Sequence, residues 1–206
     1  MAEFPETRIS LILRLAHQGD VQAWQEFSEL YAPILYRMAL GKGMQAADAE
    51  DVTQDILFAV ARAAERFQPD ATRARFRTWL CRIARNLIAD FFAGRAKRPL
   101  SQALSDSWLQ SLYESPAGEG DFDSTFGIEY RRAVFELAAR RVRERVSQSS
   151  WQAFYLTSVL HRPLEEVATQ LDLPLGSIYV ARCRIMKMLR AEVQSFDQLG
   201  IEREHV

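Results

Sequence analysis

Polar and basic side chains recur along one face of a helix predicted for the stretch that ends at Arg190, and their types suit contacts with DNA. Apolar residues separate them at helical spacing, so the two kinds of residue fall on opposite sides. Arginine can pair with guanine edges in the major groove, and small or apolar groups can meet thymine methyls. The polar face comprises Ser177, Tyr179, Arg182, Arg184, Lys187 and Arg190.

The residues before and beneath this face complete a helix-turn-helix pattern. Apolar residues at i, i+3, i+4 and i+7 predict a first helix, and they are Leu164, Val167, Ala168 and Leu171. Pro174 cannot continue that helix but suits the start of the next, so Asp172-Leu173-Pro174 is the predicted turn. The second helix buries Ile178, Ala181, Ile185, Met188 and Leu189. A short helix, a sharp turn and a longer basic helix predict contact with duplex DNA.

The charges of the chain are divided into blocks, although the formal net charge of all 206 residues is −1. Residues 66–98 carry net +7 and residues 130–195 carry net +5, while residues 99–129 between them carry net −6. Either basic block alone would also fit a solvated helix face. Together with the helix-turn-helix pattern, the two blocks favour two nucleic-acid contacts on two separate bodies.

Helical periodicity covers the ordered part of the sequence, and we find no alternating strand pattern that competes with it. We therefore predict an all-α fold of two small helical domains. The expected helices cover residues 7–18, 21–40, 46–67, 75–94, 128–147 and 149–160, followed by the helix-turn-helix. The stretch between residues 99 and 127 is rich in Gly, Ser, Pro and acidic residues, so we expect a flexible acidic linker there. The predicted domains are thus residues 1–98 and 128–206.

Composition excludes several classes of protein. No apolar run reaches the length of a membrane span, and the N-terminus lacks the pattern of a signal peptide, so we expect a cytoplasmic protein without membrane insertion. Cys81 and Cys183 each lie among helix-forming residues and are expected to be buried thiols. The histidines show no metal-ligand spacing, and no phosphate-binding loop or nucleophile–base set occurs. We expect no metal, no cofactor and no enzymatic activity.

Two segments in this order resemble bacterial RNA polymerase sigma factors, and the small extracytoplasmic-function (ECF) group above all. Residues 48–67 and then 74–99, with the string Thr-Trp-Leu-x-Arg-Ile-Ala-Arg-Asn, resemble the second conserved region of that family. The C-terminal helix-turn-helix resembles its fourth region. The order, the linker and the missing third region also fit. The resemblance implies that the chain binds core RNA polymerase, directs it to promoters and helps to open promoter DNA.

The resemblance implies a polymerase-binding surface at the start of the third helix. Asp51, Gln54, Asp55 and Phe58 are spaced i, i+3, i+4 and i+7 and therefore share one face. That face mixes acid, amide and a large apolar ring, as protein interfaces do. The acids there would also complement the helix macrodipole, which is the alternative explanation. By the resemblance, this face docks on the clamp helices of the polymerase's largest subunit.

The resemblance also implies a surface for the minus-ten promoter element between residues 67 and 98. Opened DNA needs aromatic surfaces for unstacked bases and cations for phosphates. The predicted contacts are Phe67, Arg73, Arg75, Phe76, Arg77, Trp79, Arg82, Arg85, Asn86, Asp90, Arg95, Lys97 and Arg98. Arg82, Asn86 and Asp90 lie on one stripe. We expect Ile83 and Leu87 in the core, while Trp79 fits the core and the DNA surface equally well.

The third implied surface contacts the minus-thirty-five element through the second helix of the helix-turn-helix. The candidates are Ser177, Tyr179, Val180, Arg182, Arg184 and Lys187. Here the chain departs from the commoner family pattern, which has Lys-Ser-Arg where this chain has Tyr179-Val180-Ala181 and usually leucine in place of Arg182. The fold therefore transfers, but the identity of the bases that are contacted does not.

Two other functions remain open. A stand-alone helix-turn-helix regulator would account for residues 130–195, but not for the aromatic and basic residues at 67–79 or the acidic face at 51–58. An all-helical adaptor that binds only proteins fits less well with each basic block. Many proteins of the resembled family are controlled by an anti-sigma factor, so such a partner is also open here.

Overall fold

The computed structural model describes residues 11, 14–15, 20–64, 74–94 and 121–197. The regular elements in these ranges are helices and none is a strand, which confirms the all-α prediction. Among the described helices, none combines the length and the apolar character that a membrane crossing needs. The chain divides into two compact units: unit 1 is Met1–Ala133 with Leu199–Val206, and unit 2 is Val134–Gln198.

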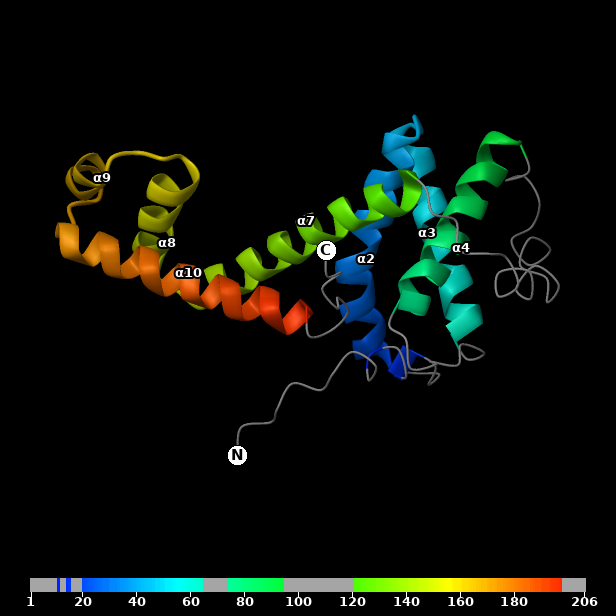
Figure 1. Cartoon of the computed structure of the whole chain (residues 1–206), viewed down its shortest axis with the longest axis horizontal. Helices are drawn as coiled ribbons and strands as arrows, with labels where there is room; N and C mark the ends of the chain where they lie inside the picture. The colour runs from blue at the N-terminus through cyan, green and yellow to red at the C-terminus, as the bar shows by residue number, and fades with distance from the viewer. Residues whose placement is uncertain (1–10, 12–13, 16–19, 65–73, 95–120, 198–206) are drawn as a thin grey trace, which may run out of the picture. The chain divides into compact units, whose positions relative to one another are not determined.

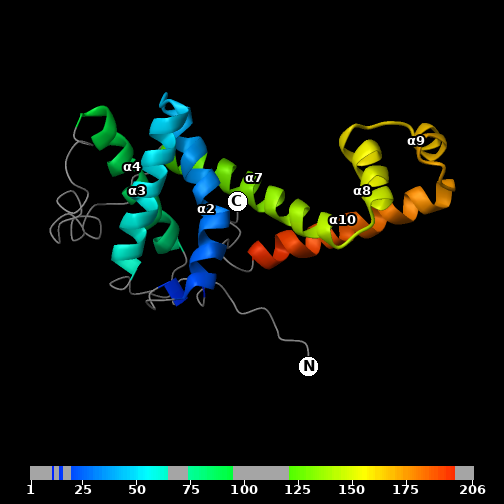
Figure 2. The ribbon, with the colours of Figure 1, turned by 180° about the vertical axis from the view of Figure 1, so that it is seen from behind.

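Three helices form the body of unit 1: α2 (Val21–Gly41), α3 (Ala46–Ala64) and α4 (Ala74–Phe92). Figures 1 and 2 show α3 lying beside both of the others. Each helix turns one apolar stripe inward, as the periodicity predicted. The largest fully buried side chains of these helices are Phe27, Leu30, Ile34, Leu35, Ile56, Leu80 and Ile83.

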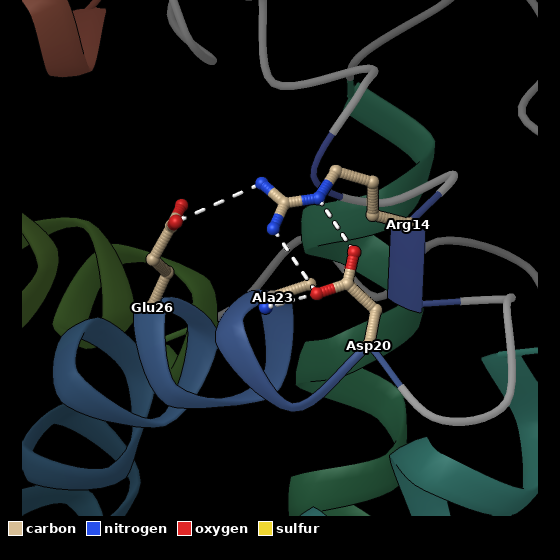
Figure 3. Close-up of polar contacts among 4 residues, drawn as sticks. All are labelled: Arg14, Asp20, Ala23 and Glu26. Atoms are coloured by element: carbon tan, nitrogen blue, oxygen red, sulfur yellow. Dashed lines mark hydrogen bonds and ion pairs between the residues drawn. The ribbon is translucent and has the colours of Figure 1, made fainter.

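The start of α2 is fixed by a cap and an ion pair (Figure 3). A carboxylate oxygen of Asp20 accepts the backbone N–H of Ala23 at 2.8 Å, which satisfies one of the free donors of the first turn. The guanidinium group of Arg14 donates two hydrogen bonds to the same carboxylate, at 2.8 and 3.1 Å. It also lies 3.6 Å from Glu26. Asp20 is therefore the N-cap of α2, directly before the helix that was predicted to begin at residue 21.

The first half of α7 (Asp121–Glu144) belongs to unit 1, and it corrects the predicted linker. Residues 121–127 were expected to be flexible, yet they are helical. The aromatic rings of Phe126 and Tyr130 pack on Tyr31 of α2, with ring centroids 6.4 and 6.2 Å away. Phe122, Phe126, Tyr130 and Ala133 are buried at helical spacing. That stripe outweighs the Gly- and acid-rich composition of the segment. Linker residues 99–120 lie outside the described residues.

A charged contact supports the same packing. Arg37 of α2 forms an ion pair with Glu129 of α7, and the two side chains are 19% and 18% exposed. Lys42 places its ammonium group 5.9 Å from the ring centroid of Phe122. A partly desolvated pair of this kind adds little if both partners are present, but the loss of one partner leaves a buried charge uncompensated.

Unit 2 combines the second half of α7 with α8 (Gln148–Phe154), a π-helical turn η2 (Tyr155–Val159), α9 (Leu164–Leu171) and α10 (Leu175–Asp197). Val142, Phe154, Ile185 and Leu189 form one buried cluster. Ala153, Val167 and Ile178 form a second one, which joins α8, α9 and α10. The single helix predicted for 149–160 is thus interrupted by the π-turn.

The junction of α9 and α10 follows the predicted turn closely. Asp172 adopts left-handed backbone angles, φ 52° and ψ 49°, which end α9. The N–H of Leu173 then donates to the carbonyl of Ala168 at 3.0 Å. The carbonyl of Pro174 accepts the N–H of Ser177 at 2.8 Å and so begins α10. Asp172-Leu173-Pro174 therefore reverses the chain between two helices.

We predict that Glu129→Arg loosens the first half of α7 from α2. Two guanidinium groups would then face one another at half-buried positions, at a cost of about 1–3 kcal/mol in local opening free energy. Hydrogen exchange read by mass spectrometry should become faster over residues 21–41 and 121–133.

The double variant Arg37→Glu with Glu129→Arg restores an opposite-charge pair and should return the exchange rates toward those of the parent. Glu144→Arg makes the same charge change at an exposed position of α7 and should have little effect. Parent-like exchange in Glu129→Arg would show that this contact does not hold α7 in place.

Candidate functional site

One face of α3 is polar and open to solvent. Asp51, Gln54 and Phe58 are exposed and Asp55 is half-buried, while Val52, Ile56, Ala59 and Val60 on the other side are buried. Phe58 is 51% exposed, which is high for a phenylalanine in a small folded unit. The predicted sharing of one face by these four residues is confirmed. Their exposure leaves an acidic surface with an aromatic ring available to a partner.

The electrostatics of this face are unfavourable within the chain. Partial burial raises the pKa of the Asp55 carboxyl above its ordinary value, and the neighbouring carboxylate of Asp51 raises it further. Because the pKa is raised in the folded state, the ionised carboxylate opposes folding once the pH rises above that pKa. A cationic partner would offset this cost. Perturbed carboxylates of this kind gather at functional sites more often than elsewhere on a surface.

Two of the aromatic residues that were predicted to contact opened DNA lie in the core instead. Phe76 and Trp79 are 6% and 3% exposed, with ring centroids 5.5 Å apart. The ring of Phe76 also lies 6.2 Å from each of the rings of Phe27 and Tyr31. The prediction that Phe76 contacts DNA is therefore wrong for this fold, and of the two positions left open for Trp79 the structure has the one in the core. Both side chains share the buried stripe of α4 with Leu80 and Ile83.

The polar stripe of α4 is partly open. Arg82, Arg85, Asn86 and Asp90 are all half-buried, and the predicted core residues Ile83 and Leu87 are buried. Arg82, Asn86 and Asp90 follow one another at four-residue intervals along one side of the helix. Their heads thus form a mixed cationic, amide and anionic row beside the core. Phe67, Arg73, Arg95, Lys97 and Arg98, and the side chains of Arg75 and Arg77, lie outside the described residues.

The outward face of α10 carries the remaining candidates. Ser177, Tyr179, Val180, Arg182, Arg184 and Lys187 are all exposed, as predicted, and Ile178 and Ile185 are fully buried. Cys81 is buried as expected, but Cys183 is exposed among these residues, so the prediction for Cys183 is wrong. The helical spacing places Cys183 opposite the core stripe, and its neighbours Arg182 and Arg184 are consistent with an exposed position.

Two features of unit 2 were not predicted from the sequence. Leu175 and Gly176 begin α10 on exposed positions beside the polar face. An apolar groove of about 380 Å³ also opens beside the π-turn, lined by Phe135, Phe154, Val159, Met186 and Leu189 among others. A π-turn breaks the regular period and was not expected, because nothing in the sequence marks it. Thr157 stabilises it by donating to the carbonyl of Ala153 at 2.7 Å.

Comparison with known families gives one match. The family described as sigma-70 region 2 matches residues 27–98. These residues contain α3 and α4 and most of α2, and hence the acidic face and the polar stripe described above. The helices α9 and α10 lie outside the matched region.

Curated proteins extend the similarity over most of the chain. The chain is 27% identical over 171 residues to the ECF RNA polymerase sigma factor RpoE of Cereibacter sphaeroides, covering 82% of this chain and 86% of that protein. It is 23% identical over 183 residues to the ECF RNA polymerase sigma-E factor of Escherichia coli, covering 88% and 90%.

A third similarity is closer but shorter. The chain is 30% identical over 121 residues to the ECF RNA polymerase sigma factor SigE of Mycolicibacterium smegmatis, which is 58% of this chain but 45% of that protein. The family model and these three relatives all point to sigma factors, and the all-helical fold is consistent with them. Residues 27–98 therefore belong to the sigma-70 region 2 family, and over most of its length the chain is similar to ECF RNA polymerase sigma factors.

Proposed function

We propose that this chain binds core RNA polymerase, directs it to specific promoters and helps to open promoter DNA in the cytoplasm. The observation that carries the proposal is the position of the family match. It covers the helices that present the acidic face of α3 and the polar stripe of α4, two surfaces that unit 1 does not need for its core. A sigma factor requires one surface for the polymerase and one for DNA, and unit 1 offers both.

The acidic face of α3 is the proposed polymerase contact. Asp51, Gln54, Asp55 and Phe58 combine charge with an exposed ring, and rings of this size are enriched where proteins bind each other. The raised pKa of Asp55 supports a cationic partner, since such a partner would favour the ionised carboxylate that burial and Asp51 disfavour. An interface formed here would also cover Phe58.

The minus-ten element is proposed to meet α4 and its flanking segments. Arg82, Arg85, Asn86 and Asp90 supply charge and hydrogen-bonding groups beside the duplex, with Arg95, Lys97 and Arg98 for phosphates. Because Phe76 and Trp79 are buried, Phe67 is the aromatic candidate that remains for an unstacked base in this segment. Arg73, Arg75 and Arg77 are retained as cations of the same surface.

The minus-thirty-five element is proposed to meet α10. The short turn after α9 and the exposed basic face of α10 match the way in which helix-turn-helix proteins place a helix in the major groove. In this proposal, unit 1 binds the polymerase and the minus-ten element, and unit 2 binds the minus-thirty-five element. Helix α7 runs from unit 1 into unit 2. An anti-sigma factor remains a further candidate partner.

The alternative is a DNA-binding regulator that acts without being part of the polymerase. The exposed face of α10 would suffice for it, but the acidic face of α3 would have no partner. Transcription in vitro separates the two functions. With purified core polymerase and genomic fragments, this chain should produce promoter-dependent transcripts that are absent when either protein is omitted. If a control sigma factor yields such transcripts and this chain yields none, the proposed function is wrong.

We predict that Asp51→Arg with Asp55→Arg weakens binding to core polymerase by about tenfold or more, because like charges would then meet across the interface. Titration of labelled chain with core polymerase measures the effect. Glu50→Arg is the matched control, since Glu50 is exposed on the same helix but outside the acidic face.

Asp55→Asn separates stability from binding. Removal of the disfavoured charge should raise the free energy of unfolding at neutral pH, and this gain should fade as the pH falls and Asp55 becomes protonated in the parent. The same variant should bind polymerase less tightly. Parent-like polymerase affinity in both variants would exclude this face as the interface.

A further inference from the structure

The first turns of α10 carry an apolar centre on their outward face. With 3.6 residues per turn, positions 176, 180, 183 and 187 lie opposite the buried residues Ile178, Ile185 and Leu189. Val180 is 63% exposed and its neighbour Tyr179 is 60% exposed. The centre of the outward face is therefore a branched hydrocarbon side chain, with Ser177 and Arg184 on one side of it and Tyr179 on the other.

Gly176 lies one turn before Val180, and the folded chain does not account for it. A Cβ atom added at Gly176 would meet nothing within 4 Å. Its φ angle is not in the left-handed region that favours glycine. Glycine also weakens a helix relative to alanine, so the residue brings no gain to the fold. A remaining use of a glycine on an exposed helix face is to let another molecule approach the backbone closely.

A single exposed valine is ordinary on a protein surface. Here, however, Val180 follows Gly176 by one turn of α10. Both residues lie near the N-terminus of α10, and in helix-turn-helix proteins the N-terminal residues of the second helix contact base edges. Valine restricts its own side chain in a helix, so helix propensity does not explain it either. In the major groove, thymine differs from the other bases by its C5-methyl group, and apolar side chains recognise that group by contact.

We propose that Val180 recognises a thymine methyl group in the upstream promoter element and that Gly176 admits the DNA close to the backbone of α10. This inference rests on the proposed function, in which α10 enters the major groove. It assigns a chemical preference to this chain: a T·A base pair, with the methyl group facing α10, opposite the first two turns of the helix. Arg184 and Ser177, next to Val180 on the same face, are left to contact polar base edges and phosphates.

Replacement of single thymines by deoxyuridine tests the methyl contact, because uracil keeps the pairing and the O4 acceptor and lacks the methyl group alone. Holoenzyme made from the full chain and core polymerase is titrated with promoter duplexes, each carrying one such replacement upstream. Loss of the contacting methyl should weaken binding by about three- to fivefold, the effect of exposing one methyl-sized apolar group. In Val180→Ala the same replacement should have almost no further effect.

Gly176→Ala tests the close approach with two readouts that should move in opposite directions. Helix propensity should leave the melting temperature unchanged or raise it, whereas the added methyl should weaken binding to every upstream element. Gly41→Ala is the matched control. Gly41 ends α2 in unit 1, and a Cβ atom there also meets nothing within 4 Å, so upstream binding should be unaffected.

The outcomes separate this inference from the function beneath it. The methyl contact is overturned if duplex binding is sequence-specific but no deoxyuridine replacement weakens it. It is also overturned if the weakening persists in Val180→Ala. In both cases the proposed sigma-factor function stands. Parent-like binding by Gly176→Ala would overturn the close approach. If the parent holoenzyme shows no dependence on any upstream sequence, the proposed role of α10 fails and the inference fails with it.

Discussion

Each helix of these small units buries one stripe of its surface, and that constraint decides which residues are left for a partner. On α3, burial of Ile56 and Val60 leaves Phe58 exposed. On α10, burial of Ile178 and Ile185 leaves Val180 and Lys187 on the opposite side. On α4, the same constraint draws Phe76 and Trp79 into the core and so removes them from the DNA surface. The proposed functional surfaces of the chain are therefore the helix faces that its core leaves exposed.

The charges of the chain serve two different purposes. Arg37 with Glu129 joins α2 to α7 in unit 1, and Arg145 with Glu192 joins the turn after α7 to α10 in unit 2, so these charges support the fold. Asp51 and Asp55 are instead two like charges on adjacent turns, and the raised pKa of Asp55 reflects the cost of that arrangement. A fold gains nothing from such a pair, whereas a cationic interface does. Local conflicts of this kind are expected where function constrains the sequence.

Much of this arrangement could be predicted from the sequence, because helical period determines burial. The outward residues of α10, the shared face on α3 and the turn at Asp172-Leu173-Pro174 all follow from spacing alone. Helical spacing did not predict the first part of α7, because the composition of that segment indicated a linker. Phe122, Phe126 and Tyr130 form a regular stripe, but the Gly- and acid-rich stretch around them indicated a linker. The π-turn at Tyr155–Val159 and the ion pair of Arg37 depend on tertiary contacts, which a local pattern does not contain.

In the proposed function, the side of α10 opposite its core stripe meets promoter DNA while the chain is bound to polymerase. Cys183 reports on that side without any mutation, because its thiol is exposed there, and buried Cys81 is an internal reference. The measurement is the rate of Cys183 alkylation, followed by mass spectrometry, in holoenzyme with and without a promoter duplex that includes the upstream element. Promoter DNA should strongly slow alkylation of Cys183, whereas duplex that lacks the upstream element should not. Equal rates in the presence and absence of bound promoter would contradict this role of α10.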